Sequence, residues 1–189
     1  MCGIVAAASN RNVVPILLDG LNRLEYRGYD SAGIALTENN KILRIRKQGK
    51  VAELHKTIKK EKNFKSPIGV AHTRWATHGE PSEMNAHPHV SGDDYSNSEI
   101  ALVHNGIIEN FADIREKLTA EGYVFSSKTD SEVIVHLIHL YRKEHDLMGA
   151  VARATNDLVG DFAITAIEAS NPDTVSYTHL RAHETEAEL

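Results

Sequence analysis

The sequence predicts an α+β fold built on a mixed or antiparallel sheet. Candidate strands gather early in the chain in hairpin-like pairs. The candidate helices between them do not follow the regular strand–helix–strand alternation of a doubly wound parallel sheet. The chain has 189 residues, 41% of them hydrophobic, which is enough for one domain with a sizeable core.

The first half of the chain contains four candidate strands and two candidate helices. Pro15 falls in the first turn of the first helix, where proline is tolerated. Asn39 and Asn40 predict a tight turn between two strands. One face of the first helix is expected to carry Ile16, Leu17, Leu21 and Leu24. The expected elements are a strand at Gly3–Ala8, a helix capped by Asn10 or Asn12 and reaching about Tyr26, strands at Ala32–Thr37 and Ile42–Arg46, a helix at Val51–Lys60 and a strand at Ile68–Trp75.

The second half contains two candidate strands and three candidate helices. The polar stretch Ser91–Ser98 (SGDDYSNS) predicts a surface loop. The expected elements are a strand at Ile100–His104, helices at about Phe111–Glu121, Ser131–Glu144 and Met148–Asp157, and a strand at Asp161–Glu168.

Composition limits the classes of function. The formal net charge of −5 gives no sign of the basic face that nucleic-acid binding requires, so no nucleic-acid partner is expected. The longest apolar runs are too short to cross a bilayer. The N-terminus has no basic segment followed by an apolar stretch, the pattern of a signal peptide. We therefore expect a cytoplasmic protein with no membrane partner.

Cys2 is the only cysteine, so an internal disulfide is impossible. A lone cysteine is commonly a small buried hydrophobe. This one directly follows Met1, which is commonly removed before a small residue, and removal would leave Cys2 with a free α-amine. Because an α-amine has a pKa of about 7.7–8.0, it could take the thiol proton and later protonate a leaving group. Cys2 is therefore a candidate nucleophile.

Five blocks of the sequence stand out: Met1–Val5 (MCGIV), Arg27–Gly33 (RGYDSAG), Ala71–Gly79 (AHTRWATHG), His104–Asn110 (HNGIIEN) and Thr129–Glu132 (TDSE). In this order and spacing, they resemble the class II glutamine amidotransferases, which belong to the N-terminal nucleophile hydrolases. Together they span nearly all of residues 1–174. The middle positions of the second block look like the glutamine–fructose-6-phosphate aminotransferase family rather than the phosphoribosylpyrophosphate or asparagine-synthetase families. Two features depart from that family: Ala6 stands where a glycine is expected, and the Ser91–Ser98 loop is longer than in many relatives.

The resemblance implies a four-layer αββα sandwich of the N-terminal nucleophile hydrolase type, incomplete at its C-terminal end. It implies hydrolysis of glutamine to glutamate and ammonia without a cofactor. In the full enzyme the ammonia would convert fructose 6-phosphate to glucosamine 6-phosphate, and the missing C-terminal domains would form a homo-oligomer. Two alternatives remain open: the glutaminase domain of another amidotransferase, such as the phosphoribosylpyrophosphate enzyme, and a non-catalytic module that retains the fold.

The resemblance also implies catalytic roles for three residues. Cys2 would attack the amide carbon, and the Asn105 side chain and the Gly106 N–H would hold the resulting oxyanion. Preorganised donors of this kind lower a barrier by about 2.7–4 kcal/mol each. Taken alone, Asn105-Gly106 is also typical of a hairpin turn.

Substrate recognition and gating are implied at six further positions. A guanidinium matches a carboxylate through two parallel hydrogen bonds, which suits Arg74 to the α-carboxylate of glutamine. Asp130 would bind the α-ammonium group, and Thr77 and His78 would line the same pocket. Trp75, the only tryptophan, is either a core aromatic or a gate toward the ammonia passage. Arg27 would shape the mouth of the site.

Several histidines raise the question of a metal site. His87 and His89 could offer two imidazoles. No carboxylate or second cysteine stands at a recognisable ligand spacing, so no metal is expected. We interpret His87 and His89 as part of a structural loop around Pro88.

The end of the chain predicts a boundary after Thr174. Val175–Thr185 (VSYTHLRAHET) resembles the translation of a sequencing-library adapter, and Glu186–Leu189 is interpreted as its continuation. The predicted glutaminase domain is therefore 1–174, incomplete, followed by an artefactual tail at 175–189. A genuine polar tail is the alternative. The pair His179 and His183 has a metal-site spacing but is set aside for the same reason.

Overall fold

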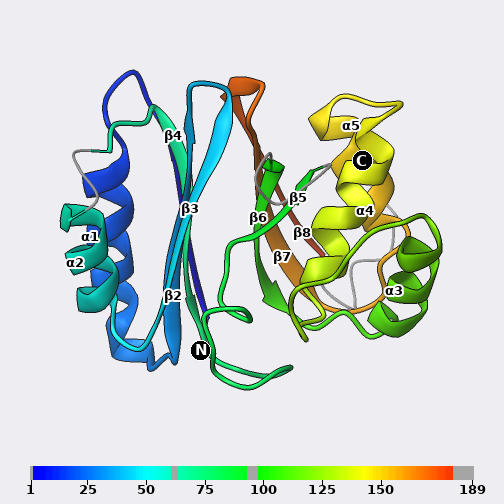
Figure 1. Cartoon of the computed structure of the whole chain (residues 1–189), viewed down its shortest axis with the longest axis horizontal. Helices are drawn as coiled ribbons and strands as arrows, with labels where there is room; N and C mark the ends of the chain where they lie inside the picture. Colours follow the sequence, from blue (N-terminus) through cyan, green and yellow to red (C-terminus); the bar gives the residue numbers. More distant parts are fainter. Residues whose placement is uncertain (1, 61–63, 93–97, 181–189) are drawn as a thin grey trace.

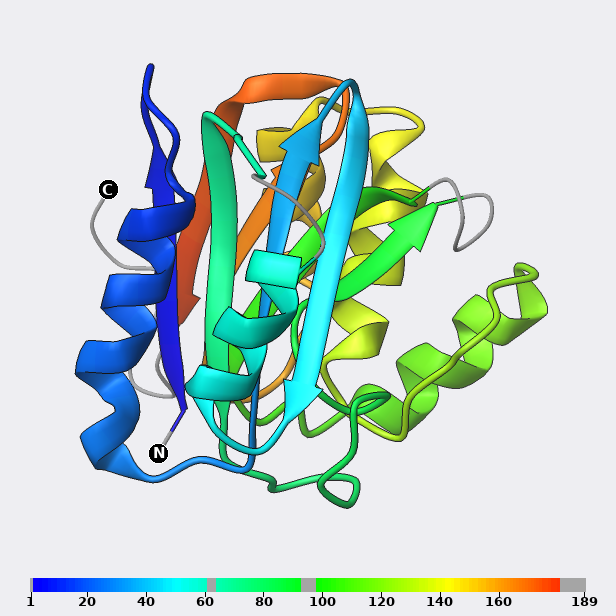
Figure 2. The same ribbon diagram turned by 60° about the vertical axis from the view of Figure 1, so that its left-hand side comes forward.

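The computed structural model describes residues 2–60, 64–92 and 98–180. Two antiparallel sheets face each other, and helices cover the outer side of each sheet (Figure 1). The expected four-layer αββα sandwich is therefore confirmed. Turning the molecule by 60° shows the first helix lying along the outer face of the first sheet (Figure 2).

The first sheet has the strand order β1-β4-β2-β3. Its strands are β1 (Gly3–Ala8), β2 (Ser31–Glu38), β3 (Lys41–Gln48) and β4 (Ile68–Arg74). All its pairings are antiparallel. Asn39 and Asn40 connect β2 to β3 with φ of 51° and 57°, which confirms the predicted tight turn because asparagine tolerates the left-handed region.

Two helices, α1 (Val14–Leu24) and α2 (Val51–Lys60), cover the outer face of this sheet. The predicted buried face of α1 is correct at Leu17 and Leu21 and wrong at Ile16, which is 46% exposed. The helix starts at Val14, later than predicted, and this start sets the inward stripe as Val14, Leu17, Leu18 and Leu21. A short 3-10 turn, Glu25–Arg27, then leads to β2.

The second sheet has the order β5-β6-β7-β8 and is antiparallel throughout. Asp146 caps one of the helices on its outer face by accepting a hydrogen bond from the Gly149 N–H at 2.8 Å. The strands are β5 (His89–Gly92), β6 (Ser98–Gly106), β7 (Phe162–Glu168) and β8 (Asn171–Leu180), and the helices are α3 (Phe111–Ala120), α4 (Glu132–Arg142) and α5 (Leu147–Thr155).

Strands β5 and β8 were not predicted. The expected Ser91–Ser98 loop is wrong at its start, because Ser91 and Gly92 belong to β5 and Ser91 is buried. Its centre, 93–97, lies outside the described residues. Strand β8 crosses the predicted boundary at Thr174, and this boundary stays a prediction.

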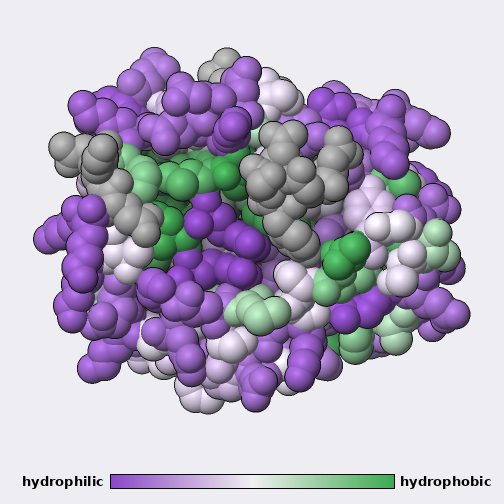
Figure 3. Space-filling view, in the orientation of Figure 1, coloured by the Kyte–Doolittle hydropathy of each residue, from purple (hydrophilic) through white to green (hydrophobic). Residues whose placement is uncertain are grey.

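The surface in Figure 3 is mostly hydrophilic, and apolar side chains form a band along the upper edge of a central hollow whose floor is hydrophilic. In the described part of the chain, no helix has the length and apolar character needed to span a bilayer.

The layer between the two sheets changes character along the strands. At one end, a buried cluster joins apolar side chains of both sheets, including Ile68 and Val70 of β4 and Val103 of β6. Because side chains alternate along a strand, His72 and Asn105 follow on the same inward faces. The apolar end holds the sheets together, and the polar end forms the candidate site.

Candidate active site

One pocket of about 460 Å³ opens where β4 and β6 end. It is lined by all nine residues that the sequence predicted: Cys2, Arg27, Arg74, Trp75, Thr77, His78, Asn105, Gly106 and Asp130. Its remaining lining residues, which the sequence reasoning missed, are His87, His104, Ile107, Thr129 and Ser131. Four of these five directly flank a predicted residue in the chain, so adjacency was the available signal.

Cys2 lies at the start of β1 with its sulfur at the pocket. The Trp75 N–H donates a hydrogen bond to Cys2 Sγ at 3.2 Å, and Sγ lies 3.6 Å from the Trp75 carbonyl oxygen. The side chain is only partly buried. Cys2 is therefore not the small core hydrophobe that a lone cysteine commonly is.

Asn105 and Gly106 end strand β6, where they pair with Ala163 and Phe162 of β7. The hairpin-turn alternative for Asn105-Gly106 is therefore wrong. Gly106 has a φ of +131°, and a Cβ there would lie 2.0 Å from the Asp161 carbonyl oxygen. Only glycine fits this position, and the close approach lets the strand end inside the pocket.

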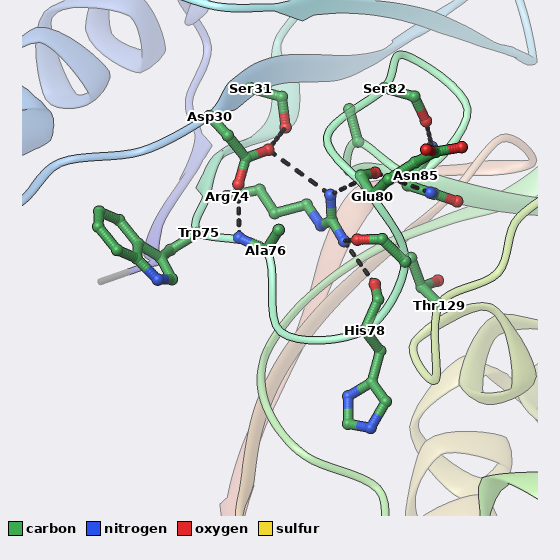
Figure 4. Close-up of polar contacts among 12 residues, drawn as sticks. Asp30, Ser31, Arg74, Trp75, Ala76, His78, Glu80, Ser82, Asn85 and Thr129 are labelled. Atoms are coloured by element: carbon green, nitrogen blue, oxygen red, sulfur yellow. Dashed lines mark hydrogen bonds and ion pairs between the residues drawn. The ribbon is translucent and has the colours of Figure 1, made fainter.

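Arg74 is buried, and its guanidinium shapes the loop that follows β4 (Figure 4). Nη2 donates to the carbonyl oxygens of His78 at 2.5 Å and Gly79 at 2.9 Å. Nη1 lies 3.5 Å from a carboxylate oxygen of Asp30. Arg74 thus fixes the loop that carries Thr77 and His78 to the pocket, a structural role the sequence did not reveal.

Asp30 holds the chain beside the nucleophile (Figure 4). Its backbone N–H donates to the Arg74 carbonyl oxygen at 2.7 Å, and its carboxylate accepts a short hydrogen bond from the Ala76 N–H. These contacts flank Trp75 on both sides. Asp30 therefore helps to aim the Trp75 N–H at Cys2 Sγ.

Asp130 is buried at the start of α4, where its carboxylate accepts a hydrogen bond from the Ile108 N–H at 2.9 Å. The neighbouring Glu132 accepts hydrogen bonds from the backbone N–H groups of Ser126 and Ser127. Burial alone would raise the pKa of Glu132, but His136, whose Nε2 lies 3.8 Å from the carboxylate, and the hydrogen bond from Ser127 outweigh it and hold that pKa below its ordinary value. The segment around Asp130 is thus fixed by buried hydrogen bonds to carboxylate oxygens.

Trp75 is 54% exposed, so the core-aromatic interpretation of this residue is wrong. Its side chain points away from Arg74 (Figure 4). A Cβ at Gly28 would lie 2.9 Å from the Trp75 ring, so this glycine allows the ring to pack against the chain after Arg27. Arg27 donates from Nε to the Tyr26 hydroxyl at 3.1 Å. A gating role for Trp75 and Arg27 stays a prediction.

Four buried histidines, His72, His87, His89 and His104, cluster at the pocket, and His87 and His104 line it. The rings of His72 and His87 have centroids 4.2 Å apart, and those of His87 and His89 are 4.6 Å apart. Burial lowers the pKa of His72 to about 3 and that of His104 to about 4, and it also lowers the pKa values of His87 and His89. All four rings are therefore neutral at pH 7. Within the described residues, no three or more His, Cys, Asp or Glu side chains are grouped to hold a metal ion.

Residues 72–179 match the family model described as "Glutamine amidotransferase domain". The chain is 50% identical over 174 residues to the glutamine–fructose-6-phosphate aminotransferase [isomerizing] of Acinetobacter baylyi, covering 92% of this chain and 27% of that protein. It is 54% identical over 175 residues to the protein of the same name from Idiomarina loihiensis, covering 92% of this chain and 28% of that protein. The chain thus spans little more than a quarter of the length of these relatives.

Solved structures agree in fold. The glutamine phosphoribosylpyrophosphate amidotransferase of B. subtilis superposes with a TM-score of 0.72 at 27% identity, covering 89% of this chain and 35% of that chain. A glutamine aminotransferase class-II domain protein from Silicibacter pomeroyi superposes with a TM-score of 0.61 at 16% identity, covering 98% of this chain and 79% of that chain. At this identity, the similarity supports the fold alone.

Proposed function

The chain belongs to the glutamine amidotransferase domain family, and from this membership we propose that it hydrolyses the side-chain amide of glutamine to glutamate and ammonia. One observation supports the proposal most strongly. Cys2, which directly precedes β1 of the first sheet, and Asn105 and Gly106, which end β6 of the second, line the same pocket. A nucleophile and a pair of oxyanion donors on one cavity are what hydrolysis of an amide through a thioester requires.

Cys2 acts as the nucleophile in this proposal. After removal of Met1, its own α-amine takes the thiol proton, and the thiolate attacks the amide carbon of glutamine. The Trp75 N–H, 3.2 Å from Sγ, stabilises negative charge on the sulfur. The C–N bond of the tetrahedral intermediate then breaks, the protonated amine returns its proton, and ammonia leaves. Water hydrolyses the resulting thioester and releases glutamate.

The oxyanion forms between the two sheets. The Asn105 side-chain amide and the Gly106 N–H are the proposed donors, and their positions at the end of β6 hold them rigidly. Removing one such donor typically lowers kcat by about 10²–10³-fold. Rigid donors need no reorganisation as charge develops, which is the source of this effect.

Arg74 and Asp130 are the proposed partners of the glutamine α-carboxylate and α-ammonium groups. Both are buried at the pocket, where charge–charge interactions are stronger than in water. Since Arg74 also holds the carbonyl oxygens of His78 and Gly79, a bound carboxylate would share the guanidinium with this loop. Substrate binding and the shape of the loop would then be coupled.

The acceptor of the ammonia is proposed from the relatives named as fructose-6-phosphate aminotransferases. In the whole protein, ammonia would pass to fructose 6-phosphate and give glucosamine 6-phosphate. The phosphoribosylpyrophosphate enzyme is the competing assignment because its structure is similar at 27% identity. Supplying each sugar phosphate with glutamine to the full-length protein, and measuring which one is aminated, distinguishes them.

A Cys2→Ala variant tests the glutaminase proposal. We expect glutamate release to fall by at least about 10³-fold, because no other group in the pocket replaces the thiolate. The melting temperature should stay within a few degrees of the parent, since Cys2 is only partly buried.

Mass spectrometry of the parent provides the control, because the proposed base exists only once Met1 has been removed. Equal rates for parent and variant would remove Cys2 from the mechanism. A processed, folded parent without glutamate release would support a non-catalytic module.

A further inference from the structure

We infer that His72 is a positioning residue for the oxyanion donor: its Nε2–H holds the Asn105 side-chain oxygen and so turns the Asn105 NH₂ group toward Cys2. This inference rests on the proposed glutamine hydrolysis. His72 Nε2 and Asn105 Oδ1 are 2.8 Å apart. His72 is only 1% exposed, whereas Asn105 lines the pocket.

The contact joins the two sheets at the site. His72 lies on β4 of the first sheet, and Asn105 lies on β6 of the second. In the β1–β4 ladder, Ile4 pairs with His72 and Gly3 with Thr73, so the backbone of His72 is tied to the strand that starts after Cys2. A single side chain thus connects the strand of the nucleophile to the donor it must face.

With the Asn105 side-chain oxygen facing His72, only one tautomer of His72 fits this contact. An amide oxygen accepts hydrogen bonds and cannot donate, so Nε2 must carry a hydrogen. Burial lowers the pKa of His72 to about 3, which leaves the ring with one proton at pH 7. That proton therefore sits on Nε2, and Nδ1 is left bare. Consistent with this tautomer, the buried Nδ1 has no hydrogen-bond partner among the described residues.

The opposite arrangement would not support catalysis. If His72 carried its proton on Nδ1, Nε2 would accept from the Asn105 NH₂ group and Asn105 Oδ1 would turn to the pocket. A carbonyl oxygen there would repel the oxyanion, and the buried Nδ1–H would lack an acceptor, at a cost of about 1–3 kcal/mol. The two arrangements have the same heavy-atom distance and differ in tautomer and amide orientation.

Kinetics of two His72 variants test the role. His72→Phe keeps an aromatic ring and removes the donor, whereas His72→Gln keeps an N–H near the position of Nε2. We expect His72→Phe to lower kcat for glutamine hydrolysis by about 10–100-fold with KM changed by less than about threefold, because only the transition state is affected. His72→Gln should recover most of this loss.

A double variant separates positioning from a general structural role. If His72 acts through Asn105, adding His72→Phe to Asn105→Ala should lower kcat by less than about a further threefold. If the fold-loss of kcat in the double variant equals the product of the losses in the two single variants, the inference is overturned. His139→Phe is the matched control, since His139 is also buried, with its Nδ1 2.7 Å from the Tyr123 hydroxyl oxygen, but does not line the pocket. It should lose stability and keep kcat.

Nitrogen-15 NMR of the histidine rings provides a readout independent of activity. In the parent and in Cys2→Ala, the His72 signals should be those of the neutral Nε2–H tautomer. A neutral Nδ1–H tautomer would overturn the inference, even with full glutaminase activity. If the parent releases no glutamate, the proposed function fails, while the tautomer still decides the orientation of Asn105. This measurement also serves if His72→Phe does not fold.

Discussion

The two ends of the layer between the sheets differ in chemistry although the same strands build both. At one end, Ile68, Val70, Ala101 and Val103 are fully buried in an apolar cluster. At the other end, the same inward faces of β4 and β6 carry His72 and Asn105. The change occurs within two residues on each strand.

The two ends therefore make different contributions: the apolar end mainly stabilises the fold, and the polar end mainly orients the groups of the site. The apolar end removes hydrocarbon from water, worth about 25 cal/mol per Å² of buried surface, and needs no specific orientation. The polar end buries groups that are costly unless they are hydrogen-bonded, and each bond fixes an orientation. We therefore expect substitutions at the apolar end to change the free energy of unfolding and those at the polar end to change kcat.

The largest expected effect on stability is at Ile68. Ile68→Ala removes a fully buried side chain from the apolar cluster and should lower the free energy of unfolding by about 2–5 kcal/mol. Glutamine hydrolysis below the melting temperature should keep kcat within about twofold, because Ile68 lies six strand residues, or roughly 20 Å, from Arg74. Urea unfolding and kinetics on one preparation check both. A loss of kcat without loss of stability would contradict the separation.

The next effect is a dependence of stability on pH that only the polar end provides. The pKa values of His72, His87, His89 and His104 are lowered in the fold, so below about pH 6.5 the unfolded state takes up protons first. As the pH is lowered below about 6.5, the free energy of unfolding should therefore decrease by about 1.4 kcal/mol per pH unit for each such histidine. The histidines contribute fully to the free energy of unfolding above pH 7. As the pH falls, their contribution decreases until the pH reaches the pKa in the folded state, about 4 for His104 and about 3 for His72.

Two variants sharpen this measurement. His87→Leu should reduce the slope between pH 6 and 5 by about 1.4 kcal/mol per pH unit. Ile68→Ala should lower stability at every pH and leave the slope unchanged. Urea titrations at pH 7.5, 6.0 and 5.0 compare the three proteins. An unchanged slope in His87→Leu would mean that His87 is not neutral in the fold.

Periodicity and turn residues predicted most elements of the fold. The helix Val51–Lys60 has the predicted bounds, and the Asn39–Asn40 turn was placed correctly, because the signals for both are local. Strand β5 was not predicted, because His89–Gly92 shows no clear alternation of apolar and polar residues and forms a strand through its pairing with β6. The four-layer arrangement followed from the resemblance and not from periodicity.

The residues of the site were predictable through motifs, whereas their partners were not. All nine predicted residues line the pocket, since the family blocks name them directly. The His72–Asn105 bond spans 33 positions and two sheets, so no local pattern indicates it. The burial of the Arg74 guanidinium against His78 and Gly79 likewise depends on the loop path after β4.

The smallest expected effect concerns the outer layer, which belongs to neither end of the interior. The sequence predicted Asn10 or Asn12 as the cap of the first helix, whereas the N-cap position is Val13, which makes no side-chain capping bond. Asn12 Oδ1 accepts from the Val14 and Ser66 N–H groups, each at 3.2 Å, whereas Asn10 is exposed. Asn12→Ala should lower the free energy of unfolding by about 0.5–1 kcal/mol, or the melting temperature by about 1–4 °C, without changing kcat or the pH slope. Asn10→Ala is the matched control and should match the parent, so an equal loss in both variants would contradict a specific role for the Asn12 hydrogen bonds.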